Sequence, residues 1–361
     1  MTDIAADPTR PDVTIPALDG FRAVAILIVI ASHVGLQHMV PGQFGVTMFF
    51  FLSGYLITTL LRRELERSGR IDFRAFYRRR AVRILPPMYI TLAFYVLLSG
   101  LGLIGPITPR GLFFDIGFLS NYFPISGIPI GLWSLAVEEH FYFGFPLLLA
   151  LLFRRFSFAG CAAACLALCA AVLAVRFWQV RQLDHLDAMT FWTHTRIDSI
   201  LFGAVLALWN NPVADRTDVL PRGWTGYALA AALLAPTFLL RDEVFRQTLR
   251  YTIQGLGLMV LFNTAIRDRA LAPVLLDSAI ARQIALLSYT VYLVHSGLII
   301  MVQRPDASHP LLPTAAAVVG AFVYALAMHR WVERPMSRWR RAKERAAPQP
   351  SAPAAPGGVK G

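Results

Sequence analysis

Ten apolar stretches alternate with short polar segments along the chain, and each is about long enough to cross a bilayer as an α-helix. A shorter apolar segment at 111–123 cannot span, so we expect it to be interfacial or re-entrant. The pattern predicts an all-α fold, a polytopic transmembrane bundle of about ten helices. The stretches fall at about 22–40, 44–61, 86–104, 132–153, 157–177, 193–209, 224–240, 251–266, 283–302 and 312–332.

The composition agrees with a membrane protein, because 56% of the 361 residues are hydrophobic, more than in a soluble domain of this size. The net charge of +12 would suggest a nucleic-acid partner in a soluble protein. Here the charge lies in short segments between apolar stretches, so no nucleic acid is expected. Cys161, Cys165 and Cys169 share one face of an apolar helix, which favours helix packing over a metal or redox site.

Basic residues predict the orientation of the helices. With a cytoplasmic N-terminus and alternating spans, 26 of the 34 Lys and Arg residues fall in inner segments and eight in outer ones. This asymmetry predicts an even number of spans and two cytoplasmic termini. The membrane domain is expected at 16–341, after a short cytoplasmic segment at 1–15 without a cleavable signal peptide. Residues 342–361, rich in Ala and Pro, predict a disordered cytoplasmic tail.

Arg22 and His33 stand eleven positions apart in the first stretch, and every residue between them except Ser32 is apolar. Eleven residues turn an α-helix by about 1,100° and advance it by about 16 Å. Both side chains therefore lie on one stripe, with Arg22 at the membrane edge and His33 near mid-depth. An ionisable group at that depth normally faces the protein interior or a wet cavity, although an isolated histidine there is more often a packing residue.

Further ionisable residues come to a similar depth on other helices, towards their outer ends. Two adjacent glutamates on a helix point about 100° apart, so at most one of them aims squarely at a given target. Together with His33, these residues predict a polar cavity that opens outwards. They are Glu138, Glu139, Arg196, Asp198 and His295.

The inner segment 62–84 carries nine arginines, among which Arg80 and Arg83 lie one helical turn apart. One reading is a positively charged anchor on anionic lipid. The other is a site for a cytosolic donor that carries phosphate, because arginine binds phosphate in a bidentate manner. Composition alone leaves both readings open.

Seven motifs follow one another along the chain: Leu18–Arg22 with His33, Gly45–Ile57, Arg80–Arg83 with Ile84 and Pro86, Trp133–Tyr142, Arg196–Gly203, Tyr292–His295 and Glu333–Pro335. Each motif is weak alone, but in this order they resemble the bacterial integral-membrane acyltransferase 3 family from about Ile15 to Pro335. His140 stands where the family pattern has Gln, so its role stays open.

The resemblance implies transfer of an acyl group, most often acetyl, from cytosolic acyl-CoA to a hydroxyl of an extracytoplasmic or lipid-linked glycan. The expected location is the bacterial cytoplasmic (inner) membrane. His33 would be the general base. A carboxylate, Glu139 rather than Glu138, would orient His33 or polarise the acceptor. Arg80 and Arg83 would hold the phosphates of CoA.

Asp19 and Arg22 are expected at the inner mouth, on the path of the donor. Acyl-CoA is a co-substrate, and no tightly bound cofactor or metal ion is expected. The partners are then acyl-CoA, a glycan or glycosylated small molecule, and membrane lipids. The residues predicted to contact the acceptor are Trp133, Tyr142, Arg196, Asp198 and His295. Arg196 and Asp198 could instead form an ion pair in the cavity wall.

A proton-coupled transporter of small solutes or glycans is the alternative function, because buried His and Glu would suit a proton relay. Two observations weigh against it. The chain has no visible internal repeat, and a transporter does not require the inner Arg-x-x-Arg element. A purely structural membrane scaffold would leave the intramembrane charges unexplained.

Overall fold

The computed structural model describes residues 16–346 except 125–126, 129–130, 217, 269 and 304–309. Within these residues the regular elements are all helices and no strand occurs, which confirms the predicted all-α fold. The elements are α1 (Pro16–Ala31), η1 (Ser32–Leu36), α2 (Gly42–Ser68), α3 (Phe73–Gly100), α4 (Pro109–Ile116), α5 (Leu132–Phe153), α6 (Phe158–Gln179), η2 (Asp187–Thr190), α7 (Thr193–Trp209), α8 (Gly223–Leu239), α9 (Glu243–Gln247), α10 (Leu249–Arg267), α11 (Leu271–Leu276), α12 (Ala279–Val302), α13 (Leu311–Met328), η3 (His329–Glu333) and α14 (Arg334–Ala346).

Seven helical segments of the described chain are long and apolar enough to cross a membrane, judged by length and composition. They are α1 with η1, α2, α3, α5, α6, α12, and α13 with its continuation through η3. The helices α7, α8 and α10 coincide with the other three predicted stretches but are shorter or less apolar. All ten predicted stretches therefore form helices, whereas a count of ten spans stays a prediction.

The helices α2 and α7 form the centre of the bundle, and glycines let their backbones touch. A Cβ atom on Gly54 of α2 would lie 1.9 Å from the carbonyl oxygen of Ile200 in α7. A Cβ on Gly203 of α7 would lie 2.1 Å from the carbonyl oxygen of Phe51 in α2. Only glycine permits this approach, which fixes the position of α2 and of the cavity wall that it carries.

The helix α6 packs on the other side of α7 through its three cysteines. Cys161, Cys165 and Cys169 are all buried free thiols, and the Cys169 sulfur lies 4.0 Å from the Asp198 carbonyl oxygen. Small side chains at every fourth position allow the two helices to come close. The predicted packing role of this stripe is confirmed.

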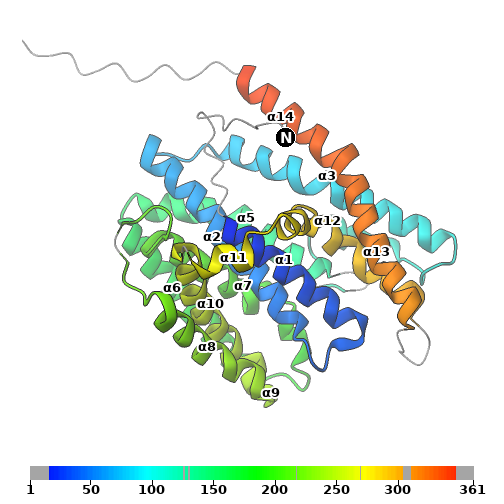
Figure 1. Cartoon of the computed structure of the whole chain (residues 1–361), viewed down its shortest axis with the longest axis horizontal. Coiled ribbons are helices and arrows are strands. Elements are labelled where there is room, and N and C mark those ends of the chain that lie inside the picture. The colour runs from blue at the N-terminus through cyan, green and yellow to red at the C-terminus, as the bar shows by residue number, and fades with distance from the viewer. Residues whose placement is uncertain are drawn as a thin grey trace, which may run out of the picture.

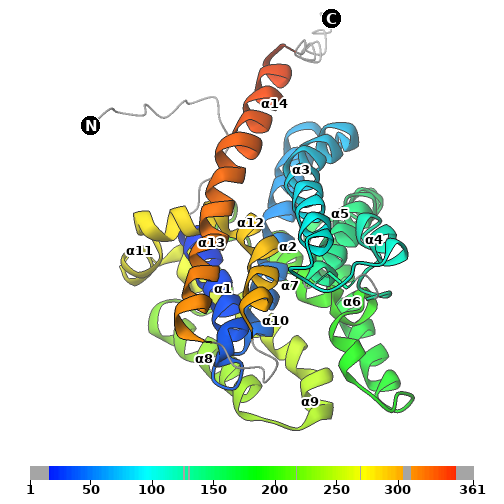
Figure 2. The same ribbon diagram turned by 90° about the vertical axis from the view of Figure 1, so that its right-hand side faces the viewer.

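The helix α13 continues through η3 into α14, and this rod projects beyond the bundle at one end (Figure 2). The short helix α9 lies at the opposite end in both views (Figures 1 and 2). Helix α14 ends at Ala346, so residues 342–346 of the predicted disordered tail are helical. The rest of that tail, and the predicted segment at 1–15, lie outside the described residues.

Candidate active site

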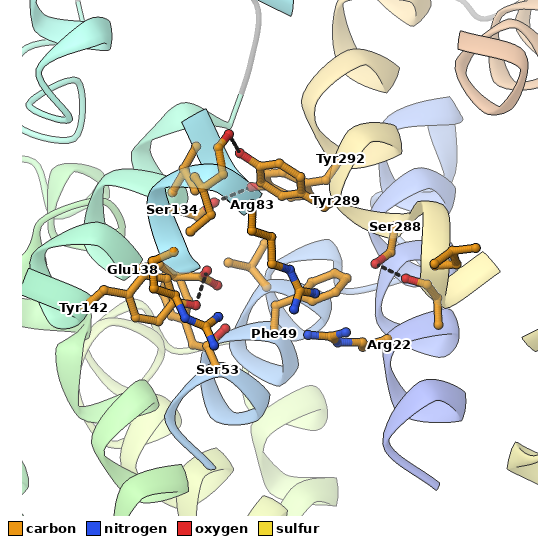
Figure 3. Close-up of a pocket in the computed structure, with 17 residues that line it drawn as sticks. Arg22, Phe49, Ser53, Arg83, Ser134, Glu138, Tyr142, Ser288, Tyr289 and Tyr292 are labelled. Atoms are coloured by element: carbon orange, nitrogen blue, oxygen red, sulfur yellow. Dashed lines mark hydrogen bonds between the residues drawn. The ribbon is translucent and has the colours of Figure 1, made fainter. Parts of the chain in front are cut away.

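A cavity of about 110 Å³ lies among α1, α2, α3, α5 and α12 (Figure 3). A second space of about 190 Å³ adjoins it and shares Arg22, Ser53, Arg80, Arg83 and Tyr142 as lining residues. We call Asp19, Arg22, Arg80 and Arg83 the arginine mouth, because they line this second space near the start of α1. The predicted donor-path residues of α1 and the predicted phosphate-binding residues of α3 thus come together in one place.

Within the described residues, the three arginines of the mouth form no ion pair within 4.0 Å, although Asp19 and Glu138 are close enough to attract Arg22. Among the described ion pairs, none involves Arg22, Arg80 or Arg83. By contrast, Arg62 is bound by Asp215 at 2.5 Å, and Arg79 lies 3.7 Å from a carboxylate oxygen of Glu64 on α2. Unpaired guanidinium groups clustered around a cavity provide donors for an anionic ligand.

Glu138 lies beyond the arginines, on the face of α5 that also presents Ser134 and Tyr142 at a spacing of four residues. The Tyr142 hydroxyl donates to Glu138 Oε2 at 3.0 Å. In Figure 3, Arg22 and Arg83 point into the space in front of Phe49, opposite Glu138 and Tyr142.

Glu139 is turned away from the cavity lining, because consecutive residues of a helix differ by about 100°. Its Oε1 atom is buried and accepts no hydrogen bond from the described residues. We expected Glu139 rather than Glu138 to act at the site, but Glu138 lines the cavity and Glu139 does not. The catalytic role of either carboxylate stays a prediction.

Tyr292 of α12 closes the other end of the cavity. Its hydroxyl lies 2.6 Å from Ser134 Oγ and donates to the Gly131 carbonyl oxygen at 3.1 Å. Its ring centroid is 5.7 Å from that of His295, one turn further along α12. Tyr292 therefore lines the cavity and also lies beside His295. The sequence motif indicated the residue but not this position.

His33 lies in η1, the π-helical turn that ends α1. Its Nδ1 atom donates to the Val29 carbonyl oxygen at 2.8 Å, and the turn is completed by Gly35 with φ of 99°. This hydrogen bond assigns the proton of neutral His33 to Nδ1 and leaves a lone pair on Nε2. A backbone carbonyl therefore orients His33, and the predicted orientation by Glu139 or Glu138 is not seen.

His295 of α12 is an ionisable neighbour of His33. The two ring centroids are 5.0 Å apart with an interplanar angle of 87°. His33 is exposed at the end of α1, whereas His295 is only 2% exposed. Neither ring lines the cavity, so the structure does not place the predicted base in the predicted donor site.

Asp198 and Arg196 do not form the predicted ion pair. Asp198 is bound by Arg176 of α6 at 2.6 Å, and both side chains are completely buried. Arg196 instead lies over the Tyr251 ring, 3.8 Å from its centroid, and donates to Thr47 Oγ1 at 3.1 Å. Residues two apart on a helix face different directions, which explains the correction. Neither side chain reaches the cavity lining.

Trp133 lies behind the cavity wall, with its ring 6.0 Å from that of the lining residue Phe50 and 5.2 Å from that of Phe191. His140, whose role was open, has its Nδ1 atom 2.6 Å from Thr193 Oγ1. It therefore joins α5 to the start of α7. Of the residues predicted to contact the acceptor, Tyr142 lies in the cavity and His295 lies next to its end.

Comparisons with known proteins agree with the motifs. A model of the acyltransferase domain family matches residues 15–330 of the chain. The proteins named O-acetyltransferase OatA in Staphylococcus aureus strains NCTC 8325 and COL are each 26% identical to the chain over 350 residues. Another protein of strain COL, whose name calls it a candidate O-acetyltransferase, is 28% identical over 358 residues.

Each of these matches covers 90% of this chain and 57% of the relative. The chain thus spans a little over half the length of the curated relatives that it matches. No solved structure matches the chain.

Proposed function

Because this chain belongs to the acyltransferase domain family, we propose that it is a membrane O-acyltransferase that moves an acetyl group from cytosolic acetyl-CoA to a hydroxyl of an extracytoplasmic or lipid-linked glycan. The names of its relatives support the acetyl group and the oxygen acceptor. The observation that carries the proposal is the arginine mouth, where three unpaired guanidinium groups lead into a cavity lined by Glu138.

The donor would bind with its phosphates at the arginine mouth. The residues fit such a group, because each guanidinium offers two parallel donors to a phosphate and none of the three forms an ion pair within 4.0 Å with a carboxylate of the described chain. Phe49, Phe50 and Leu135 line the deeper cavity and would surround the apolar acyl end. Glu138 lies beside them, held by Tyr142, where it could bind the acceptor hydroxyl or polarise it.

The acceptor would approach from the side of His33. In the proposed step, the hydroxyl gives its proton to His33 Nε2 while its oxygen attacks the thioester carbonyl. The new bond is the ester C–O bond and the broken bond is the thioester C–S bond, so the sulfur leaves as a thiolate. The two substrates would meet near Tyr292, which lines the cavity beside His295.

The orientation in the membrane is part of this proposal. We infer that the chain crosses the inner membrane of a bacterium ten times and that both termini lie in the cytoplasm. The arginine mouth then faces the cytosol and His33 faces the outside. The distribution of 26 inner and eight outer basic residues supports this orientation. A reporter fused to the C-terminus should read cytoplasmic, and a periplasmic reading would refute both the even count and the donor side.

The test of the function uses cell membranes that contain the chain, incubated with radiolabelled acetyl-CoA. Label should appear covalently on glycan and be released by mild base, as expected for an ester. A proton-coupled transporter, the alternative function, would leave the glycan unlabelled. The family match favours the acyltransferase. The labelling experiment distinguishes the two functions directly.

A further inference from the structure

His295 holds a buried ring nitrogen without a partner. Its Nδ1 atom donates to the Tyr292 carbonyl oxygen at 2.9 Å and approaches the Val291 carbonyl oxygen at 3.1 Å. Its Nε2 atom is buried and has no hydrogen-bond partner among the described residues. Buried polar groups are nearly always hydrogen-bonded, and an orphaned one reduces stability, so this nitrogen needs an explanation.

The arrangement of His33 repeats that of His295. Each Nδ1 atom donates to a carbonyl of the preceding turn of its own helix, which leaves the lone pair of each neutral ring on Nε2. The ring centroids are 5.0 Å apart, so the two imidazoles are direct neighbours. The other titratable groups beside His295 in the described structure are Tyr292 on α12 and Tyr95 of α3.

We propose that His295 is a proton carrier that returns the proton taken by His33 to the leaving thiolate. This proposal rests on the proposed acyl transfer. In that reaction the acceptor hydroxyl loses one proton and the departing CoA sulfur gains one, so the proton must move from the acceptor side to the cavity side. His295 lies between the exposed His33 and Tyr292, which lines the cavity, and is therefore on that path.

The pair carries one proton at a time. Two imidazolium rings at this separation, in a poorly solvated place, repel each other strongly. When His33 Nε2 receives the hydroxyl proton, His295 Nε2 is the free acceptor next to it. Once the bound substrates have displaced the Tyr292 ring, protonated His295 gives this proton to the thiolate, which becomes the CoA thiol, and both rings return to their neutral state. The unpartnered nitrogen is thus the position that the proton occupies in transit.

A purely structural role for His295 makes different predictions. A packing histidine with two backbone hydrogen bonds could be replaced by Gln at some cost in stability, and turnover per folded molecule would persist. A proton carrier cannot be replaced by Gln, because an amide does not take up a proton at neutral pH. The distinction therefore lies in turnover at saturating donor and not in the amount of protein.

The experiment compares wild type, His295→Gln and His295→Ala in membranes supplied with radiolabelled acetyl-CoA, with activity expressed per folded molecule. His194→Ala is the control, because His194 is a partly buried and hydrogen-bonded histidine, bonded to Tyr122 at 3.0 Å and to Gln179 at 2.8 Å, that lies off the path. We expect His295→Gln to keep the KM for acetyl-CoA and to lose about 10²-fold or more in kcat. Added imidazole should restore part of the turnover of His295→Ala and leave His194→Ala unchanged.

The proposal is overturned if His295→Gln keeps near-normal kcat, or if the loss in both His295 variants follows the loss of folded protein and imidazole rescues neither. A failure of the underlying function is a separate result, because in that case wild type itself does not move label from acetyl-CoA to glycan.

Discussion

Replacing Arg80 by Ala should weaken the binding of acetyl-CoA without unfolding the protein. Arg80 lines both parts of the cavity, is partly buried and forms no ion pair in the described chain. A hydrogen bond to a charged group contributes about 1.5–3 kcal/mol, which corresponds to about a 10- to 150-fold rise in the apparent KM for acetyl-CoA. Arg80→Lys should restore part of this, because it keeps the charge but not the two-pronged donor.

The adjacent Arg79 provides the control. It lies on the same helix but is directed at Glu64, with 37% of its side chain exposed and a separation of 3.7 Å. Such a surface pair contributes about 0–1 kcal/mol, so Arg79→Ala should leave the donor KM near that of wild type. The assay is the initial rate of ester formation as acetyl-CoA is varied, at matched amounts of inserted protein.

The result that would refute this reasoning is equal behaviour of the two variants. If Arg80→Ala and Arg79→Ala insert normally and share the wild-type KM, then Arg80 belongs to a lipid anchor and the arginine mouth is not the donor site. Removal of either arginine from a lipid anchor would be expected to change insertion or orientation and not donor dependence.

Three further predictions concern other parts of the polar path. Turnover per folded molecule should fall by about 10²–10⁴-fold in both His33→Ala and His33→Gln. Near-normal turnover of His33→Gln would show that another residue is the general base. Glu138→Gln should impair transfer far more than Glu139→Gln when both are measured side by side, because Glu138 lines the cavity and Glu139 does not. The reverse order would indicate that Glu139 is the carboxylate that acts. Arg176→Ala should destabilise the protein by about 3–5 kcal/mol in thermal unfolding, because it leaves Asp198 buried and unpaired, and an unchanged melting temperature would contradict the assigned pair.

The helices were predictable because the lipid phase requires long apolar segments whose backbone bonds are internal. Stretches such as 132–153 and 193–209 match α5 and α7 at both ends. The grouping of Arg22 with Arg80 and Arg83 was also indicated, since all three were expected on the inner side and the structure places them on one cavity.

The rotation of α5 was not predictable. The sequence required only one of Glu138 and Glu139 to face the site, and the choice depends on how α5 packs against α2 and α12. A signal was nevertheless present: Ser134, Glu138 and Tyr142 form a polar stripe at a spacing of four, which Glu139 does not share.

The environment of His33 depends on tertiary structure that hydropathy does not encode. The expected straight helix would carry His33 on the stripe of Arg22, whereas η1 widens the last turn and bonds the ring to Val29. Gly35 in the following turn was the available sign of a helix end. The pairing of Asp198 with Arg176 likewise joins two helices. The spacing of two residues weighed against the Arg196–Asp198 pair that we considered, but it did not indicate Arg176 as the partner.

The order of His33, His295, Tyr292 and the cavity has a consequence for the electrical work of the reaction. An acyl group that passes outwards from a thioester to an alkoxide moves formally as a positive fragment. A proton that passes inwards from the hydroxyl to the thiolate along the two rings carries the opposite current. In the proposed transfer the two displacements oppose each other and one turnover moves no net charge, so its free energy should not include the voltage across the membrane.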